Sequence, residues 1–280
     1  MSTTVAPIDP LRSCPAGRYA DERLIVEPGR PLGVTAAATG DGRILVRHHL
    51  RPAELDDELG AALAAALAPL TDDHDVFARA FTGVVLTSAP QAERAWELFY
   101  RNTLARIRHA EPGYSAIYRR ALELLPRGEV LDLGCSFGFL ALHLAARGDR
   151  VTAAEIDAGT TTLVRSMARR LRRPVEVVRA DGAALPLPDG CVDAVAVLHV
   201  LEHVDDATGA EVLTEARRLA RSRVVVAVPF EERPTALFGH VRRIDAHHLY
   251  QLGHASGWSF DIHRHHGGWL VLDRPVRHHR

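Results

Sequence analysis

The stretch from Glu129 to Ala145, EVLDLGCSFGFLALHLA, constrains the fold more than any other part of the chain. It begins with an apolar run that is interrupted by Asp132. The turn GCSFG at residues 134–138 follows and leads into a largely apolar segment. This pattern predicts a buried strand, a glycine turn and a helix. Such a unit opens the ligand crevice of a doubly wound α/β sheet. Its glycines allow positive φ, and the free N–H groups at the helix start point toward a ligand.

Three kinds of binding or catalytic site use a turn of this type. A dinucleotide site requires G-x-G-x-x-G, and the middle glycine is missing here. The nucleophile elbow of a hydrolase has the pattern G-x-S-x-G, which GCSFG matches with Ser136 as the nucleophile. The pattern D-x-G-x-x-x-G from Asp132 to Gly138 resembles the turn of class I methyltransferases that use S-adenosylmethionine. The turn alone leaves these alternatives open, together with a strand–helix turn that binds nothing.

The composition of the chain excludes several classes of protein. Its 280 residues are 47% hydrophobic and 25% charged, as in a soluble globular protein, and no apolar run approaches the ~20 residues of a membrane span. The net charge of −1 gives no reason to expect nucleic-acid binding. Three scattered cysteines and a start without signal-peptide features favour the cytoplasm. We therefore expect a cytoplasmic protein without membrane or nucleic-acid partners.

Residues 1–113 carry no chemical motif, and we expect an α+β extension there. Short apolar runs on either side of the turn TGDG predict two or three antiparallel strands between residues 23 and 50. Residues 52–70 and 90–110 have helical composition. His48 and His49 are expected at a strand end near solvent. Since methyl transfer requires a site shielded from water, this extension is expected to cover such a site and select its substrate.

From Val130 onward, predicted strands and helices alternate, as a doubly wound sheet requires. Further strands are predicted at residues 150–155, 174–180, 192–197 and 224–228, and helices at 159–172, 206–220 and 245–255. Two short runs at 260–262 and 269–272 suit an antiparallel addition. The expected fold is therefore an α/β domain at residues 114–273 with a doubly wound, mostly parallel seven-stranded sheet. A basic tail is expected at 274–280.

Acidic residues follow two successive predicted strands after the glycine turn. Glu155 ends the second strand, about twenty residues after the turn, where a carboxylate can accept both ribose hydroxyls. The alternative is that Glu155 ends the strand in contact with solvent and binds no ligand. Asp181, Gly182 and Ala183 resemble the methyltransferase segment in which an acid binds the adenine amino group and the next backbone N–H binds a ring nitrogen. A hydrolase has no reason for these two acids and needs an upstream oxyanion loop, which is missing.

The chain therefore resembles the small-molecule branch of class I methyltransferases from Tyr114 to Val271. The resemblance implies S-adenosylmethionine as the cofactor. The residues that it implies for the cofactor site are Asp132, Gly134, Cys135, Ser136, Gly138, Glu155, Asp181, Gly182, Ala183 and His199.

Histidines provide the expected catalytic groups. An alcohol acceptor has a high pKa and benefits from a general base, most often histidine. His203 and then His199, in the segment HVLEHV that this family carries beside the sulfonium, are the expected bases. A packing role for His203 is the alternative. His240 and Arg242, in the segment GHVRR, are expected to contact the acceptor.

No metal ligands are assigned from the sequence. A divalent ion held by Glu202 and His203 with Asp205 and Asp206 is the alternative, because some sugar O-methyltransferases use one. The other histidines, including His247 and His248, are expected to be solvated or to bind the acceptor.

Two further stretches narrow the expected acceptor. DPLRSCPAGRYADERLIVEPG and GHVRRIDAHHL resemble the mycofactocin oligosaccharide methyltransferases, which O-methylate the glucose chain of a peptide-derived redox cofactor. That resemblance implies a sugar hydroxyl of a small glycosylated molecule as the acceptor. The alternatives are a phenol or an amine of another natural product, or a regulatory protein that binds the cofactor without turnover. The sequence leaves the oligomeric state open.

Overall fold

The computed structural model describes residues 8–14, 17–30, 32–109 and 114–275 of the chain. These form two compact units, Met1–Arg106 with Ala236–Gly239 and Ile107–Thr235 with His240–Arg280. The expected boundary after residue 113 falls beside residues 110–113, which lie outside the described ranges, as do residues 276–280 of the expected basic tail.

The segment Ala236–Gly239 joins the first unit although it is distant in sequence. The ring of Phe238 meets that of Phe77 edge-on, at 5.3 Å between centroids, and the Leu237 carbonyl lies 3.0 Å from Nδ1 of His74. Strand and helix patterns could not predict that this segment belongs to the first unit, because its place depends on tertiary packing alone.

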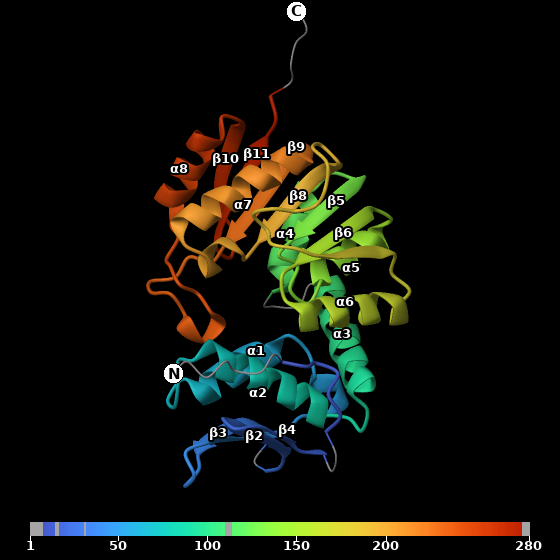
Figure 1. Ribbon diagram of the computed structural model, residues 1–280, viewed down its shortest axis with the longest axis vertical. Coiled ribbons are helices and arrows are strands. Elements are labelled where there is room, and N and C mark those ends of the chain that lie inside the picture. The colour runs from blue at the N-terminus through green and yellow to red at the C-terminus, as the bar shows by residue number, and fades with distance from the viewer. Residues whose placement is uncertain (1–7, 15–16, 31, 110–113, 276–280) are drawn as a thin grey trace, which may run out of the picture. The chain divides into compact units, whose positions relative to one another are not determined.

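The first unit contains a four-stranded sheet in the order β1-β2-β4-β3, together with three helices (Figure 1). The strands are β1 (Tyr19–Ala20), β2 (Leu24–Pro28), β3 (Gly33–Ala38) and β4 (Ile44–His49). The helices are α1 (Glu58–Leu67), α2 (His74–Thr87) and α3 (Ala92–His109), the last of which continues into the second unit. The predicted helix at 90–110 is thereby confirmed.

Two expectations for this unit are confirmed only in part. Strands β3 and β4, on either side of the TGDG turn, are antiparallel as expected, but β2 pairs with β4 in parallel. His49 is exposed at the end of β4 as expected, but the His48 side chain is buried, and its Nε2 lies 2.8 Å from the Thr87 hydroxyl. Burial lowers the pKa of His48 to about 4, so this histidine is a neutral core residue.

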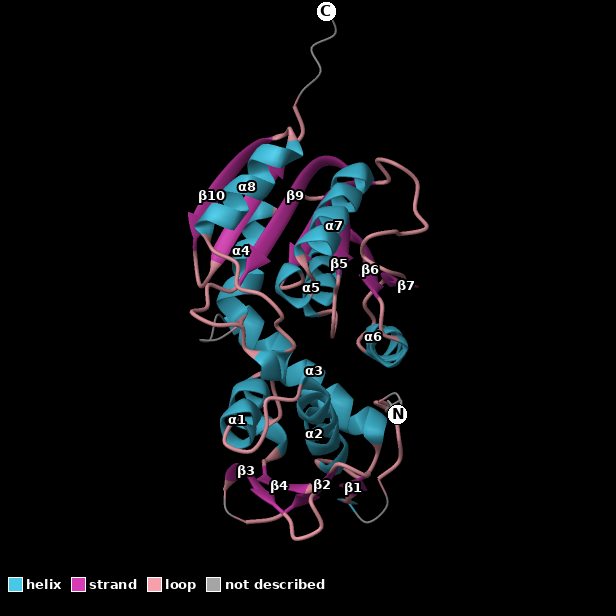
Figure 2. Cartoon of the chain, turned by 60° about the vertical axis from the view of Figure 1, so that its left-hand side comes forward, coloured by secondary structure: helices cyan, strands magenta, loops and turns pink. Residues whose placement is uncertain are grey.

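The second unit is built on the predicted doubly wound sheet, in the order β10-β11-β9-β8-β5-β6-β7 (Figures 1 and 2). Its strands are β5 (Glu129–Leu133), β6 (Arg150–Glu155), β7 (Val175–Arg179), β8 (Val192–Leu198), β9 (Ala220–Val228), β10 (Ser259–Arg264) and β11 (Gly268–Asp273). Strand β11 is antiparallel to both of its neighbours, and the other pairs are parallel. The α/β fold with a mostly parallel seven-stranded sheet is confirmed.

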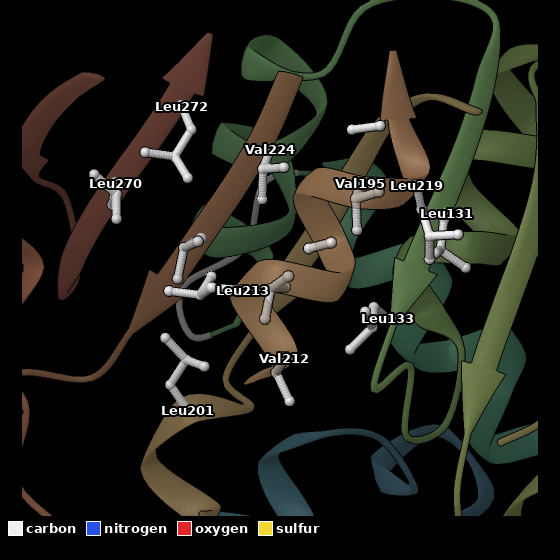
Figure 3. Close-up of a cluster of buried hydrophobic side chains, with 14 of the residues drawn as sticks. Leu131, Leu133, Val195, Leu201, Val212, Leu213, Leu219, Val224, Leu270 and Leu272 are labelled. Carbon is white, nitrogen blue, oxygen red and sulfur yellow. The ribbon is translucent and has the colours of Figure 1, made fainter. Parts of the chain in front are cut away.

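Helices cover both faces of this sheet. They are α4 (Ser115–Leu124), α5 (Phe139–Arg147), α6 (Ala158–Arg170), α7 (Asp206–Leu219) and α8 (Ala246–Ser256). On one face α7 packs on alternate residues of the central strands, among them Leu131 and Val195 (Figure 3), and α8 packs on β10 and β11. On the other face α4 and α5 pack on the intervening residues, such as Val130 and Ala194. Each fully buried leucine or valine contributes roughly 1.5–3 kcal/mol, so the centre of the sheet is a rigid base for its edge loops.

None of the helices in the described ranges combines the length and the hydrophobicity that crossing a bilayer requires.

Candidate active site

The glycine turn joins β5 to α5 at the carboxyl edge of the sheet. Gly134 and Gly138 have φ of 73° and 71°. A Cβ atom on Gly134 would lie 2.5 Å from Val200 Cγ2, and one on Gly138 would lie 2.9 Å from Val164 Cγ1. Both positions therefore require glycine, for backbone conformation and for close packing. The turn brings backbone N–H groups and the start of α5 to the end of β5.

Asp132 is a buried acid beneath this turn. Its side chain is in the core of β5, and one carboxylate oxygen accepts a hydrogen bond from the backbone N–H of Ala141 at 3.1 Å. Burial, which outweighs the opposing effect of the Ala141 hydrogen bond, and the charge of Glu155 together raise the pKa of Asp132 to about 7. A cation bound beside this carboxyl would favour its ionised form.

Glu155, the last residue of β6, is linked to the glycine turn. One carboxylate oxygen accepts from the N–H of Ser136 at 3.0 Å, and the other from Ile156 and Asp157 at 2.8 and 3.1 Å. A carboxylate offers about four acceptor positions, and three are used here. A ribose diol at Glu155 would therefore displace or share one of these backbone bonds.

Asp181, Gly182 and Ala183 follow β7 at the same edge. The Asp181 carboxylate is exposed and accepts from the Ala183 N–H at 2.9 Å. Gly182 packs so closely on Leu133 that a Cβ would lie 2.9 Å from Leu133 Cδ2. The acids after β6 and β7 therefore share one edge with the glycine turn. The hydrogen bond between the Ala183 N–H and the Asp181 carboxylate fixes the turn after β7.

Ser136 and Cys135 complete the turn. Ser136 has φ of 47°, and it is its backbone N–H that bonds Glu155. Burial raises the pKa of the Cys135 thiol well above its usual value, and the charges of Asp132 and Glu155 raise it further. Cys135 is therefore a protonated wall residue, because only the thiolate is a strong nucleophile.

Five residues at the ends of β8 and β9 form what we call the histidine–carboxylate cluster: His199, Glu202, His203, Glu231 and His240. His199 directly follows β8 with φ of 54°, and its N–H donates to the Ala227 carbonyl at 2.8 Å. A left-handed conformation outside glycine costs of order 1–3 kcal/mol and is concentrated at functional sites. Nδ1 of His199 lies 2.9 Å from an oxygen of the buried Glu202.

His240 reaches the cluster from the loop after β9. Its Nδ1 lies 2.8 Å from Glu231, which also accepts from the Thr235 hydroxyl at 2.9 Å. Partial burial alone would raise the pKa of Glu231, but the bonds from His240 and Thr235 outweigh it and lower that pKa. The exposed His203 ring meets the His240 ring edge-on, at 4.9 Å between centroids. The two expected base and acceptor histidines are thus brought together.

Arg242 has structural partners. Its Nε donates to the Leu201 carbonyl at 2.8 Å, and its guanidinium is paired with Asp206 at the start of α7. The guanidinium lies so close to Gly209 that a Cβ there would be 2.5 Å from it. This side chain fastens the loop after η4 (Ala236–Phe238) to α7, a role that the sequence did not indicate.

Glu231 was also assigned no role from the sequence. The available signal was its place in PFEE, directly after a predicted strand at the carboxyl edge. Its partner His240 stands nine residues later, so only the folded loop reveals the pair.

A cavity of about 580 Å³ lies elsewhere, lined by residues that include Glu129, Arg150 and Val175. These residues begin β5, β6 and β7 and therefore lie at the amino edge of the sheet. Because ligands of open α/β sheets bind outside the carboxyl ends of the strands, we do not assign the site to this cavity.

Comparison with known proteins shows which proteins the second unit resembles. Residues 131–228 match the family model described as a methyltransferase domain. The chain is 32% identical over 139 residues to a Mycobacterium tuberculosis protein described as a probable S-adenosylmethionine-dependent methyltransferase, covering 50% of this chain and 48% of that one. It is 35% identical over 127 residues to a demethylmenaquinone methyltransferase of Thermus thermophilus, covering 44% and 56%.

A solved structure with a similar fold is described as "Conversion of a Disulfide Bond into a Thioacetal Group during Echinomycin Biosynthesis". It has a TM-score of 0.50 and 20% identity, covering 59% of this chain and 83% of that one, which supports the fold alone.

The seven-stranded sheet and the glycine turn fit the methyltransferase domain whose family model residues 131–228 match. The chain spans about half the length of the curated relatives that it matches.

Proposed function

We propose that this protein transfers the methyl group of S-adenosylmethionine to a sugar hydroxyl of a small glycosylated molecule, the mycofactocin oligosaccharide. The observation that carries the proposal is the histidine–carboxylate cluster at the ends of β8 and β9. Two of its histidines lie against carboxylates, His199 on Glu202 at 2.9 Å and His240 on Glu231 at 2.8 Å. A hydroxyl acceptor benefits from such bases because its pKa is high.

The carboxyl edge of β5, β6 and β7 fits the cofactor. Two glycines leave space where a Cβ would clash, and acids follow β6 and β7. In our proposal Glu155 binds the ribose and Asp181 the adenine amino group. The backbone of Gly134, Cys135 and Ser136 borders the methionine end.

Further residues complete this proposed cofactor site. Gly138 allows α5 to pack beside the ligand, Gly182 and Ala183 border the adenine, and His199 lies beside the sulfonium. Asp132 provides a negative charge beneath the turn that favours the cofactor's cationic groups. The bound cofactor supplies an electrophilic methyl group on a sulfonium.

The chain's own residues then align and deprotonate the acceptor. Alignment of the acceptor oxygen about 3 Å from the methyl carbon is the main requirement of an in-line displacement. We assign proton removal to His203 in the metal-free protein, with His199 as the second candidate. His240, held by Glu231, is assigned to acceptor binding. Arg242 is assigned an indirect role in acceptor binding, since Leu201 and Asp206 hold its Nε and Nη1.

The mycofactocin oligosaccharide is proposed from the resemblance of the N-terminal stretch and of GHVRRIDAHHL. The latter contains His240, whose edge-on contact with His203 supports a role for this segment beside the reacting groups.

The decisive experiment incubates the purified chain and isotopically labelled S-adenosylmethionine with glucosylated mycofactocin. We expect one labelled methyl ether on a glucose hydroxyl. His203→Ala should lower turnover by ~10²–10⁴ while cofactor affinity stays near normal. Labelling of a phenol or an amine in a host-cell extract, with the glycan unlabelled, would replace the proposed acceptor. Cofactor binding without transfer to any acceptor would indicate a regulatory protein.

The cofactor assignment is tested separately by calorimetry with S-adenosylmethionine and S-adenosylhomocysteine. Glu155→Gln should weaken binding by roughly 1–3 kcal/mol, because the amide loses charge-assisted hydrogen bonds. Glu232→Gln, an exposed acid that follows the cluster's Glu231, is the matched control and should bind normally. Unchanged affinity in a folded Glu155→Gln protein would contradict the ribose assignment.

A further inference from the structure

Glu202 has a carboxylate oxygen whose burial needs an explanation. The residue is 1% exposed, and one of its oxygens is bonded to His199. Its Oε2 is buried and has no hydrogen-bond partner among the residues that the structure describes. Leaving a charged acceptor desolvated and unsatisfied costs more than the ~1–3 kcal/mol of a neutral group. A ligand for this oxygen would remove that cost.

Two imidazoles lie beside this carboxylate. One ligand atom each from Glu202, His203 and His240 lies within 4.8 Å of the others. The Nδ1 of His240 faces the Glu231 carboxylate at 2.8 Å, so the proton of a neutral ring belongs on Nδ1 and the lone pair on Nε2. A carboxylate that fixes the tautomer in this way is a recurring partner of metal-binding histidines.

We propose that Glu202, His203 and His240 bind one divalent transition-metal ion. Two imidazoles and one carboxylate suit Zn²⁺ and similar ions rather than Mg²⁺, which prefers oxygen ligands alone. Ligands about 2.1 Å from one ion lie about 3.0–3.4 Å apart, so the three atoms must close in slightly. The exposed His203 side chain has room to turn for this.

Neighbouring side chains already orient two of the three proposed ligands. Glu231 orients His240, and His199 holds the other oxygen of Glu202. Residues 201–203 form the short helix η3, and the Glu202 carbonyl accepts from the Val241 N–H at 2.8 Å, which ties the segment of His240 to η3. In the sequence His240 lies 37 positions after His203, and the neighbouring Asp205 and Asp206 were the expected alternative ligands. Those two acids serve as the N-cap and first residue of α7.

Three protein ligands leave coordination positions open, as in catalytic sites. This consequence rests on the proposed function: an acceptor hydroxyl bound there would lose its proton more readily, and His203 would be a ligand rather than the base. The hydroxyl proton would pass to solvent, the O–C bond would form, and the C–S bond would break to release S-adenosylhomocysteine.

The test titrates the chelator-treated full chain with Zn²⁺ by calorimetry and with Co²⁺ by visible absorption. We expect one site, with Co²⁺ bands of a histidine-ligated ion. Glu202→Gln and His240→Gln should each lower Zn²⁺ affinity at least 100-fold. Glu231→Gln should lower it about 10–100-fold through loss of orientation. If the buried substitution Glu202→Gln unfolds the chain, His203→Asn at an exposed position replaces it.

The matched control is the double variant His265→Ala/His266→Ala. These adjacent histidines are exposed, and their ring centroids lie 4.8 Å apart outside the cluster. The control should bind Zn²⁺ as the native chain does. Zn²⁺ binding that is lost in the control and kept in Glu202→Gln and His240→Gln would overturn the proposal, and so would no binding at all.

Metal binding is measured without any acceptor, so the two proposals can fail separately. Zn²⁺ bound through the three residues in a chain that methylates no glycan leaves the metal site standing and overturns the proposed function. Glycan methylation by a chain that binds no Zn²⁺ would support the proposed function and overturn the metal site.

Discussion

Replacing Asp132 by asparagine should make the protein more stable at alkaline pH and remove part of its pH dependence. The carboxyl is buried, and its pKa is about 7 in the folded chain against an ordinary value of 3.8. Because folding raises this pKa, the folded state binds the proton more tightly than the unfolded state. The stabilising effect is complete below the unfolded pKa and is lost as pH rises through about 7.

The magnitude follows from the two pKa values. One pKa unit corresponds to about 1.4 kcal/mol, so the full shift is worth roughly 4 kcal/mol. In the unfolded chain Asp132 has lost most of its proton by pH 5. The free energy of unfolding of the native chain should therefore fall by about 2–3 kcal/mol between about pH 5 and pH 8 because of this group. The asparagine side chain of the variant keeps an oxygen that can accept from the Ala141 N–H but carries no charge to desolvate.

The assay is urea unfolding of the native and Asp132→Asn chains at several pH values without cofactor. The free energy of unfolding of the variant minus that of the native chain should increase by about 2–3 kcal/mol from pH 5 to pH 8. Taking the difference cancels the groups that titrate in both proteins. A difference that does not change with pH would refute the reasoning. Cofactor affinity should fall in the variant, since the charge beneath the turn is gone.

Three further substitutions test individual residues. Gly138→Ala should destabilise the chain by more than about 1 kcal/mol, measured by thermal unfolding, because the position combines positive φ with a 2.9 Å approach to Val164. Ser136→Ala should retain most methyl transfer, because the backbone N–H rather than the hydroxyl bonds Glu155; ester hydrolysis abolished by this change would revive the elbow interpretation. Arg242→Met should lower the free energy of unfolding by about 1.5–3 kcal/mol with cofactor affinity unchanged, and a stable variant with weak acceptor binding would restore its expected contact role.

The order of the motifs and secondary-structure elements along the chain could be predicted because each depends on nearby residues. The turn GCSFG, the acids at Glu155 and Asp181 and the alternation of strands and helices are each read within a few residues. Parallel strands then bring their carboxyl ends to one edge, which makes the position of the proposed cofactor site a consequence of topology. Predictions from the sequence failed where the contacting residue is far along the chain. The buried His48 is an example, because its hydrogen-bond partner Thr87 is 39 residues away.

By itself, the sequence determined the fold class and the strand ends at which we propose the cofactor site, because apolar periodicity and glycine spacing act over single elements. Only the tertiary structure decided which polar groups meet. Burial within β5 sets the pKa of Asp132 near 7. The loop after β9 carries His240 to Glu231 and His203, and leaves an oxygen of Glu202 buried beside them. Distances and desolvation between remote residues exist only once the chain has closed on itself, so no local pattern encodes them.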